Sequence, residues 1–499
     1  MSVEHLDVLI VGAGLSGIGA AWHLQKHCPG KRYAVLEGRE SIGGTWDLFR
    51  YPGIRSDSDM YTLGYSFRPW KNAKAIADGP SILDYIRQTA RDDGIEPNIR
   101  FRHRVVRADW CSASAKWTVE VEQGEAREPL RLSCNFLLMC SGYYNYAAGY
   151  TPDFPGREQF AGRIVHPQQW TPDIDYAGKR VVVIGSGATA VTLVPAMAQE
   201  AAHVTMLQRS PTYIVSLPDQ DAIANFLRRV LPAKLAYGIT RWKNVLFGML
   251  FFWLCRHRPG LVKKMVRKGL RQQLGPKFDL DTHFTPSYNP WDQRMCMVPN
   301  GDLFRAIRQG RAAVATDHIE RFTEKGIRLR SGAELEADLI VTATGLDLQL
   351  LGGMQLSVDG RAVEAPKTIS YKGMMLSDVP NLAIALGYTN ASWTLKCDLT
   401  AEYACRLINH MDRQGYRQCT PRNNDPALQH EPFIDFSSGY VLRAADKLPK
   451  QGSRAPWRLH QNYALDLMSL HFAGLEDGAM EFARAGAVAA AAQGVADKA

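Results

Sequence analysis

Two segments of the sequence repeat one pattern, in which an apolar run is followed by a glycine-rich turn and then by an apolar-rich stretch of helical length. The first copy begins at Asp7, and its turn is Gly12-Ala13-Gly14-Leu15-Ser16-Gly17. The second copy begins at Arg180, and its turn is Gly185-Ser186-Gly187-Ala188-Thr189-Ala190. A strand, a glycine turn and a helix in this order form the phosphate-binding part of a dinucleotide domain. The sequence therefore predicts an α/β protein with two doubly wound dinucleotide-binding units.

The first turn has glycine at the three positions where a phosphate-binding turn needs it. Gly12 permits the tight turn, Gly14 lets a pyrophosphate approach the backbone, and Gly17 lets the helix pack closely on the strand. The N-terminus of the helix then offers free N–H groups and a positive dipole to the phosphates. Glu37 ends the next strand, where a carboxylate can accept hydrogen bonds from ribose hydroxyls. We therefore expect an adenine dinucleotide at this unit.

The second unit differs at the end of its second strand, where Gln208-Arg209-Ser210 contains no acid. A carboxylate would repel a 2′-phosphate, whereas a guanidinium and a hydroxyl group bind one. We therefore expect NADPH rather than NADH here, with Arg209 and Ser210 at the 2′-phosphate. The alternative is that Arg209 is an ordinary exposed residue at a strand end. The pyrophosphate is expected on four residues of the turn, Gly185, Gly187, Ala188 and Thr189.

One segment makes this chain basic. Between residues 222 and 278 the sequence has 13 Lys and Arg and no Asp or Glu, so the rest of the chain, whose total is +9, carries a net charge of −4. Because the positive charge is confined to one segment, the function of that segment must explain it. Binding to single-stranded nucleic acid would need aromatic residues for base stacking, and these are sparse in the lysine-rich part of the segment. We therefore expect no nucleic acid partner.

The N-terminal sequence and the spacing of the cysteines indicate where the protein is located in the cell and whether it binds a metal. The apolar run at residues 8–11 is short and follows Glu4 and Asp7, unlike a secretory signal. Nine cysteines are scattered without a C-x-x-C pair, which argues against a metal site or a disulfide framework. We therefore expect a cytoplasmic protein without a metal site.

Two further motifs carry a family resemblance. Gly43-Gly44-Thr45-Trp46, followed by Tyr51-Pro52-Gly53 and Asp57, resembles the second signature of class B flavoprotein (Baeyer–Villiger) monooxygenases. Residues 160–170, F-A-G-R-I-V-H-P-Q-Q-W, resemble the family fingerprint F-x-G-x-x-x-H-x-x-x-W, whose last position is usually Tyr or Phe in related N- and S-oxygenating enzymes. Thr171 departs from the Pro or Asp that usually follows the fingerprint. The resemblance extends over nearly the whole chain.

This resemblance implies a fold of two Rossmann-like, three-layer ββα domains with a helical insertion. It implies FAD bound by a discontinuous domain of residues 1–148 and 370–499, and NADPH bound by residues 149–215 and 290–369. Residues 216–289 would form the basic, apolar helical insertion. It also implies that four residues of the second signature contact the flavin cofactor: Gly44, Thr45, Trp46 and Asp57.

The resemblance also implies a chemistry. NADPH reduces FAD, the reduced flavin reacts with O2 to a C4a-peroxyflavin, and this group attacks a ketone. A fixed positive charge is needed beside the developing anion, and the matching residue is Arg294, with Asp57 orienting it. From spacing alone, Arg294 would instead form a surface salt bridge with Asp292 or another acid.

His166 lies within the fingerprint, and we do not assign it as a general base. In the family, this segment joins the two nucleotide domains. We therefore expect His166 to hydrogen-bond the backbone and to couple domain motion.

Three functions remain for comparison. The first is Baeyer–Villiger oxidation of lipophilic ketones to esters or lactones, with S-oxygenation as a further activity. The alternative is a flavin-containing N- or S-oxygenase acting on thioethers, thioamides or amines. A third hypothesis, a basic nucleic-acid- or membrane-binding flavoprotein with little turnover, is supported by the basic block alone.

The insertion contains the most hydrophobic run of the chain, at residues 245–255. Eleven helical residues extend ~17 Å, against a hydrocarbon core of ~30 Å, so this run does not span a bilayer. Two interpretations stay open. The run lines the substrate entrance as a buried helix, or it contacts a membrane surface together with the flanking basic residues of segment 240–275.

Overall fold

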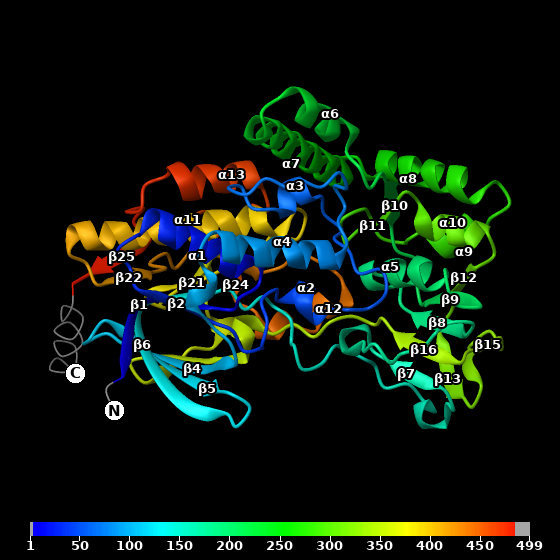
Figure 1. Cartoon of the computed structure of the whole chain (residues 1–499), viewed down its shortest axis with the longest axis horizontal. Helices are drawn as coiled ribbons and strands as arrows, with labels where there is room; N and C mark the ends of the chain where they lie inside the picture. The colour runs from blue at the N-terminus through cyan, green and yellow to red at the C-terminus, as the bar shows by residue number, and fades with distance from the viewer. Residues whose placement is uncertain (1–2, 485–499) are drawn as a thin grey trace.

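The computed structural model describes residues 3–484, and its two largest sheets, both of which contain parallel strands, lie side by side along the long axis of the molecule (Figure 1). Each sheet contains the first strand of one predicted unit. In both units the glycine turn follows this strand and leads into a helix, α1 (Leu15–His27) in the first and α5 (Ala188–Met197) in the second. The predicted α/β fold with two Rossmann-like units is therefore confirmed.

The first sheet has a parallel centre and an antiparallel arm. The centre consists of five strands: β21 (Leu382–Ile384), β6 (Glu128–Met139), β1 (Glu4–Val11), β2 (Tyr33–Leu36) and β3 (Ile99–Arg100). The arm continues from β6 through two antiparallel strands, β5 (Lys116–Gln123) and β4 (His103–Cys111). In Figure 1 this arm lies below β1 and β2.

Both faces of the parallel centre are covered. Val8 and Ile10 of β1 pack in one cluster with residues of α1, α4 (Gly79–Asp92) and α11 (Trp393–Gln414). Leu9 packs on the opposite face, in a cluster with Trp110 and Trp117 of the arm. The first unit therefore has one helical layer and two β layers, as expected for a ββα domain.

The second sheet is parallel throughout. Its five strands are, in order, β12 (Ala312–Thr316), β9 (His203–Gln208), β8 (Arg180–Ile184), β16 (Leu339–Thr342) and β7 (Arg163–Val165). One face packs against residues of α5 and α10 (Asp302–Arg308). On the other face, Val182 and Ile340 pack with Phe322 and Ile327 of an antiparallel sheet. That sheet consists of β13 (Ile319–Thr323), β14 (Gly326–Leu329) and β15 (Glu334–Glu336).

The chain returns to the first sheet earlier than the predicted boundary at residue 370. Strand β17 (Gln355–Val358) is parallel to β4 and antiparallel to β18 (Arg361–Ala362). These strands extend the arm of the first sheet, and backbone hydrogen bonding across the strand edge favours this placement. The other boundaries stay predictions, and residues 485–499 lie outside the described part of the chain.

The predicted insertion is helical. It contains α6 (Ala222–Val230), α7 (Ala233–His257), α8 (Pro259–Leu274) and α9 (Leu280–Phe284), and α6 and α7 stand out from the body at the top of Figure 1. The apolar run at residues 245–255 lies within α7. Within residues 3–484, none of the helices combines the length and the apolar character that crossing a membrane requires.

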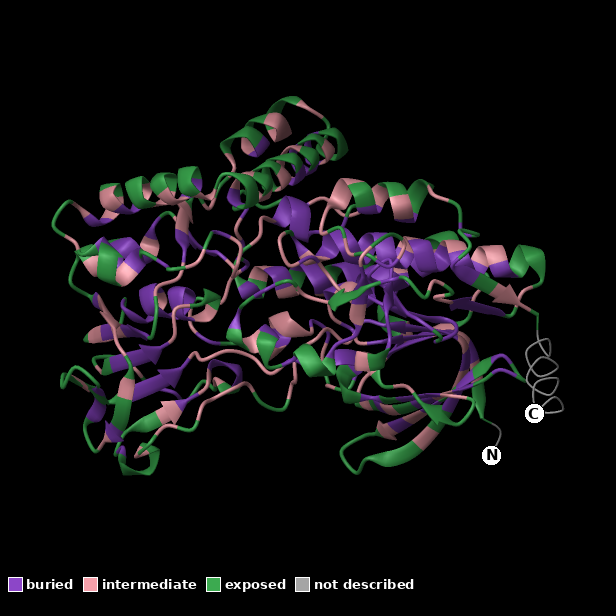
Figure 2. Cartoon of the chain, turned by 180° about the vertical axis from the view of Figure 1, so that it is seen from behind, coloured by how far each residue is buried: buried purple, intermediate pink, exposed green. Residues whose placement is uncertain are grey.

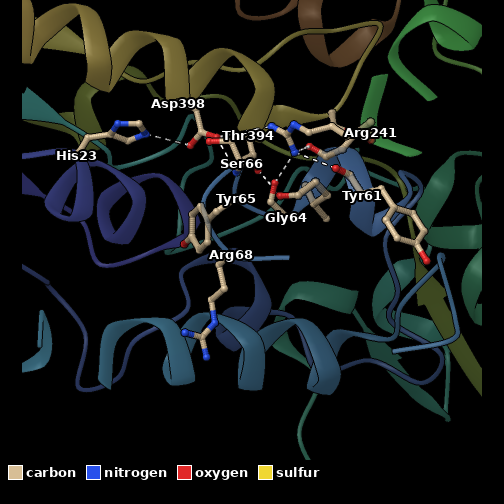
Figure 3. A network of polar contacts seen from close by, with 12 residues as sticks. His23, Tyr61, Gly64, Tyr65, Ser66, Arg68, Arg241, Thr394 and Asp398 are labelled. Carbon is tan, nitrogen blue, oxygen red and sulfur yellow. Dashed lines mark hydrogen bonds and ion pairs between the residues drawn. The ribbon is translucent and has the colours of Figure 1, made fainter. Parts of the chain in front are cut away.

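Arg241 fastens α7 to the first unit. Its side chain is buried, and Nη1 donates to the carbonyl oxygens of Tyr61 and Gly64, each at 2.8 Å (Figure 3). These carbonyls lie at the C-terminal end of α3 (Met60–Leu63), where a cation is stabilised by the helix dipole and by unpaired acceptors. Tyr237, one turn earlier on α7, donates its hydroxyl to the carbonyl oxygen of Tyr65 at 2.9 Å.

Asp398 of α11 is the buried carboxylate of this network. Its Oδ2 lies 3.6 Å from Nη2 of Arg241 and accepts the N–H of Ser66 at 3.1 Å, while its Oδ1 lies 3.6 Å from Nε2 of His23 (Figure 3). Burial raises the pKa of Asp398, but the neighbouring His23 and Arg241 lower it by more, so its pKa is below the usual range. Asp398 is therefore ionised at neutral pH and pairs with Arg241.

An Arg241→Met variant tests this attachment. It leaves Asp398 as a buried charge without its guanidinium partner and removes the donor to two carbonyls, so we expect a loss of about 3–5 kcal/mol of unfolding free energy. The measurement is the midpoint of urea unfolding. The control is Lys234→Met, because Lys234 is exposed on the same helix and should change stability by no more than about 0.5 kcal/mol. Equal midpoints for the two variants would contradict the role of Arg241.

Candidate active site

The first glycine turn has the shape that a phosphate needs. Gly12 has a φ of +104°, and a Cβ at this position would lie 2.6 Å from the carbonyl oxygen of Cys140, so only glycine fits. Gly14 caps α1 without any side-chain hydrogen bond to the helix, and Gly17 lies in its first turn. The first N–H groups of α1 are therefore free of side-chain caps and face the turn, as required for binding a pyrophosphate.

The second signature lies directly against this turn. The N–H of Gly43 donates to the carbonyl oxygen of Ala13 at 3.1 Å, and the backbone at Gly44 is close to that of Gly14. Thr45 and Trp46 begin the short helix α2 (Thr45–Leu48). The segments that sequence reasoning assigned to one flavin site thus lie together.

Glu37 is at the end of β2, as predicted, but its carboxylate already binds the protein. Oε2 accepts the N–H of Ala13 at 2.8 Å and Oε1 accepts the N–H of Arg39 at 2.9 Å. Burial raises the pKa of Glu37, although these two N–H groups oppose the shift. Each carboxylate oxygen has a second lone pair, so hydrogen bonding to a ribose stays a prediction.

Arg294 pairs with Asp57. Nη2 of Arg294 lies 2.7 Å from Oδ2 of Asp57, whereas Asp292 is bound instead by Arg256, at 2.9 Å. Of the two partners that the sequence left open, the structure therefore selects the one that the resemblance implied. The charge of Asp57 raises the pKa of Arg294 above its already high value, so Arg294 is a permanent cation.

A strap between the two units holds Asp57 in place. Phe49 and Tyr51 are buried in the core of the second unit, although they lie within the second signature, which begins beside the first glycine turn. Arg55 pairs with Asp302 of α10 at 2.6 Å. The strap of residues 49–57 thus leaves the first glycine turn, crosses to the second sheet and ends at Arg294.

Arg294 lines a cavity that is partly open to solvent. Trp393 stacks on Tyr143 in its wall, with ring centroids 5.0 Å apart. The indole Nε1 of Trp393 donates to Oγ of Ser16 at 2.8 Å. Ser16 belongs to the first glycine turn, so the cavity extends from the predicted flavin site to the permanent cation.

Three polar residues of the cavity were missed by sequence reasoning. Lys396 is buried, and its Nζ lies 2.9 Å from Oδ2 of Asp466, which also accepts the hydroxyl of Tyr388 at 2.7 Å. Burial lowers the pKa of Lys396. These residues form no local motif, and the one available signal was a charged side chain among the buried residues of α11.

The second turn repeats the features of the first. Gly185 has a φ of +136°, and a Cβ there would lie 2.3 Å from the carbonyl oxygen of Ala343. Gly187 caps α5 without a side-chain hydrogen bond, and Ala188 and Thr189 form the first turn of the helix. The N–H groups at this helix end are therefore available to phosphates.

Arg209 and Ser210 are exposed and follow β9 directly. Oγ of Ser186, which belongs to the second turn, lies 3.4 Å from the carbonyl oxygen of Ser210, so the two segments are neighbours. Among residues 3–484, no carboxylate forms an ion pair with Arg209. Its guanidinium is therefore available to an anion beside the turn.

His166 uses both ring nitrogens inside the protein. Its Nδ1 accepts the N–H of Gln168 at 3.2 Å, so its Nε2 carries the proton and donates to the carbonyl oxygen of Gly345, also at 3.2 Å. Burial lowers the pKa of His166, which keeps the ring neutral. These contacts agree with a backbone-binding role and leave no nitrogen for general base catalysis.

Comparison with known proteins identifies the class. A family model described as flavin-binding monooxygenase-like matches residues 70–411, and one described as an NAD(P)-binding Rossmann-like domain matches residues 10–78. The chain belongs to the flavin-binding monooxygenase-like family.

Its relatives are similar over their whole length. The chain is 57% identical over 482 residues to the FAD-containing monooxygenase EthA of Mycobacterium tuberculosis, covering 96% of this chain and 98% of EthA. It is 50% identical over 481 residues to a probable FAD-binding monooxygenase, AlmA, of Acinetobacter baylyi, covering 96% of each chain. The expectation of a flavoprotein monooxygenase that uses FAD and an NADP-type dinucleotide is therefore confirmed.

Solved structures share the fold. An open crystal structure of cyclohexanone monooxygenase has a TM-score of 0.76 and 19% identity, covering 96% of this chain and 100% of that chain. An oxidized steroid monooxygenase bound to NADP has a TM-score of 0.75 and 20% identity, with the same coverage. These matches confirm the predicted two-domain fold.

The contacts of His166 predict a dependence of stability on pH. The folded state holds the ring neutral with a lowered pKa, whereas the unfolded chain has an ordinary pKa of about 6.5. Below about pH 6.5, the unfolded chain therefore binds more protons than the folded protein. The contribution of His166 to the free energy of unfolding is full above this pH and is lost below it. We expect the thermal midpoint of His166→Asn to fall less between pH 7.5 and 5.5 than that of the unmodified protein. If the thermal midpoints of the two proteins fell equally with pH, His166 would have the same pKa in the folded and unfolded states.

Proposed function

We propose that this enzyme is a Baeyer–Villiger monooxygenase that converts lipophilic ketones to esters or lactones with O2 and NADPH, and that it also oxygenates sulfur. The observation that carries the proposal is the Arg294 guanidinium, held 2.7 Å from Asp57 in the wall of an aromatic cavity that begins beside the first glycine turn. When bound there, FAD reduced by NADPH supplies the activation of O2.

The residues that would hold the cofactors lie in two groups. The turn of Gly12, Gly14 and Gly17 with the N-terminus of α1 would bind the pyrophosphate of FAD, and Glu37 its ribose. The segment of Gly44, Thr45 and Trp46 would contact the flavin half. The second group would bind NADPH: Gly185, Gly187, Ala188, Thr189, Arg209 and Ser210.

Arg294 would act on the substrate oxygen. A guanidinium cannot lose its proton at any working pH, and it can donate a hydrogen bond to a ketone carbonyl. As negative charge develops on that oxygen, a fixed cation in a cavity of low polarity stabilises it without reorganisation. Asp57 would be a positioning residue that holds the guanidinium toward the cavity.

The lining of the cavity supports a lipophilic substrate. Most of its side chains are aliphatic or aromatic, and they converge on a small number of polar groups, which is typical of sites for small apolar molecules. They include Leu350, Leu386, Phe433, Ile434, Phe436 and Leu459. Two enzymes of the same fold are named for a cyclic ketone and for steroids, which supports the same substrate class.

An N- or S-oxygenase acting on thioethers, thioamides or amines is the second candidate. The same apolar cavity would admit a thioether, whose sulfur needs no cation to become reactive. Trp170 at the end of the fingerprint favours the ketone, because related N- and S-oxygenating enzymes usually have Tyr or Phe there.

Product analysis of Arg294→Met separates these candidates. If the guanidinium polarises a carbonyl, conversion of 2-octanone to its ester should fall by about 100- to 1,000-fold. Sulfoxidation of methyl phenyl sulfide and flavin content should change far less. The control is Arg256→Met, because Arg256 pairs with Asp292 and does not line the cavity. Unchanged ester formation in Arg294→Met, or no ester from any ketone with the unmodified enzyme, would refute the proposal.

Arg209→Ala tests the choice of dinucleotide. Loss of charge-assisted hydrogen bonds to a 2′-phosphate costs about 1.5–3 kcal/mol, so we expect KM for NADPH to rise by about 10- to 150-fold. KM for NADH, which lacks this phosphate, should stay constant. The measurement is steady-state oxidation of each dinucleotide with one ketone. An equal change in both constants would remove Arg209 from the 2′-phosphate site.

A further inference from the structure

Large apolar side chains are concentrated on the outside of the insertion. Of the eighteen large hydrophobic side chains that are exposed within residues 3–484, twelve lie between residues 223 and 265. Scattered exposed apolar residues are normal, but a contiguous set on one element indicates an interaction surface. Figure 2 shows the exposed residues along the helices that stand out from the body.

Helix α7 has an apolar stripe on its outer face, in addition to the apolar residues that it buries. Six exposed apolar side chains recur at intervals of three or four residues and share one face: Leu235, Ile239, Trp242, Leu246, Leu250 and Trp253. The opposite face packs on the protein and buries six other residues: Ala236, Tyr237, Thr240, Arg241, Val245 and Cys255. A helix that is stabilised by its own domain normally turns its apolar stripe inward. The outward stripe of α7 therefore needs an apolar environment outside the chain.

Helices α6 and α8 extend this apolar surface. Ile223, Phe226 and Val230 are exposed on α6 at helical spacing, and Leu261 and Met265 are exposed on α8. On α8, Lys264 and Lys268 are also exposed, and their spacing places them on the same face as Leu261 and Met265. Basic and apolar side chains thus share one surface.

Much of the positive charge in this segment is unpaired. Lys243, Arg256 and Arg267 bind acids that lie outside the segment 222–278. Within the described part of the chain, no carboxylate lies within ion-pair distance of Lys264 or Lys268. Since the segment contains no acid of its own, a partner with negative charge is the one that complements it.

We propose that α6, α7 and α8 bind the surface of an anionic phospholipid bilayer, with the outer stripe of α7 inserted among the headgroups. A bilayer can bind an apolar stripe flanked by lysines without offering a complementary groove. The apolar runs are too short to cross the bilayer, so the helices would lie in the plane of the interface. A second copy of the chain is a poorer occupant, because a symmetric contact would bring two basic segments together.

The inner side of the same helix reaches the cavity wall. Val245 and Met249 of α7 pack with Tyr388, Leu395 and Tyr463, and Tyr388 lines the cavity beside Lys396. The membrane-facing helix is therefore one side chain away from the cavity. This extension rests on the proposed function: a lipophilic ketone dissolved in the bilayer would reach the site without crossing water.

Co-sedimentation with vesicles tests the proposal on the full-length, FAD-loaded protein. Vesicles of phosphatidylcholine with 25% phosphatidylglycerol are compared with pure phosphatidylcholine, at 50 and 500 mM KCl. We expect binding to the anionic vesicles that falls at least tenfold at high salt. Lys264→Gln/Lys268→Gln should weaken this binding several-fold, and Leu246→Ser/Trp253→Ser should weaken it at both salt concentrations. Leu442→Ser is the control, because Leu442 is 61% exposed and belongs to α12 (Gly439–Leu442), outside the insertion.

Three results would overturn the proposal: no binding to anionic vesicles, equal binding by both double variants and the control, or a dimer in solution that Leu246→Ser/Trp253→Ser converts to a monomer. Turnover of a water-soluble ketone without vesicles is measured in parallel. Inactive protein that still binds vesicles would remove the proposed function and leave the membrane surface intact. Active protein that does not bind vesicles would remove the membrane surface and leave the proposed function intact.

Discussion

The ion pair between Asp57 and Arg294 joins residues that precede and follow the helical insertion, and it sets a permanent charge in the wall of the cavity. Asp57 is the last residue of a strap that starts beside the first glycine turn and has Phe49 and Tyr51 buried in the second core. The position of the charge therefore depends on how the two units pack. A change in that packing would move the guanidinium relative to the first turn.

Buried polar contacts determine how the insertion meets the rest of the chain. Arg241 binds the end of α3 and pairs with Asp398, so charge and hydrogen bonds attach α7 alongside the apolar contacts of Val245 and Met249. This arrangement frees other apolar residues of α7 to face outward. The inner face of α7 thus combines polar and apolar contacts, whereas its outer stripe is apolar.

Local patterns made much of the fold predictable. Strand, glycine turn and helix lie within about thirty residues, and backbone geometry at Gly12 and Gly185 admits no other residue, so the sequence carries these features explicitly. The pairing of Arg294 with Asp57 came from a family resemblance, because spacing alone favoured a salt bridge with Asp292 or another acid. The cluster of Lys396, Asp466 and Tyr388 was not predictable, since tertiary packing alone brings these residues together. The outward stripe of α7 was also ambiguous, because periodicity reveals an apolar face but not the direction in which it points.

Glu37 illustrates what such packing means for cofactor loading. By accepting the N–H groups of Ala13 and Arg39, its carboxylate fixes the shape of the first turn through protein groups alone. An incoming dinucleotide then finds a rigid receptor and spends little of its binding energy on restricting the backbone. Glu37, whose sequence position suggested a ligand contact, would thereby first order the backbone of the turn, before the nucleotide binds.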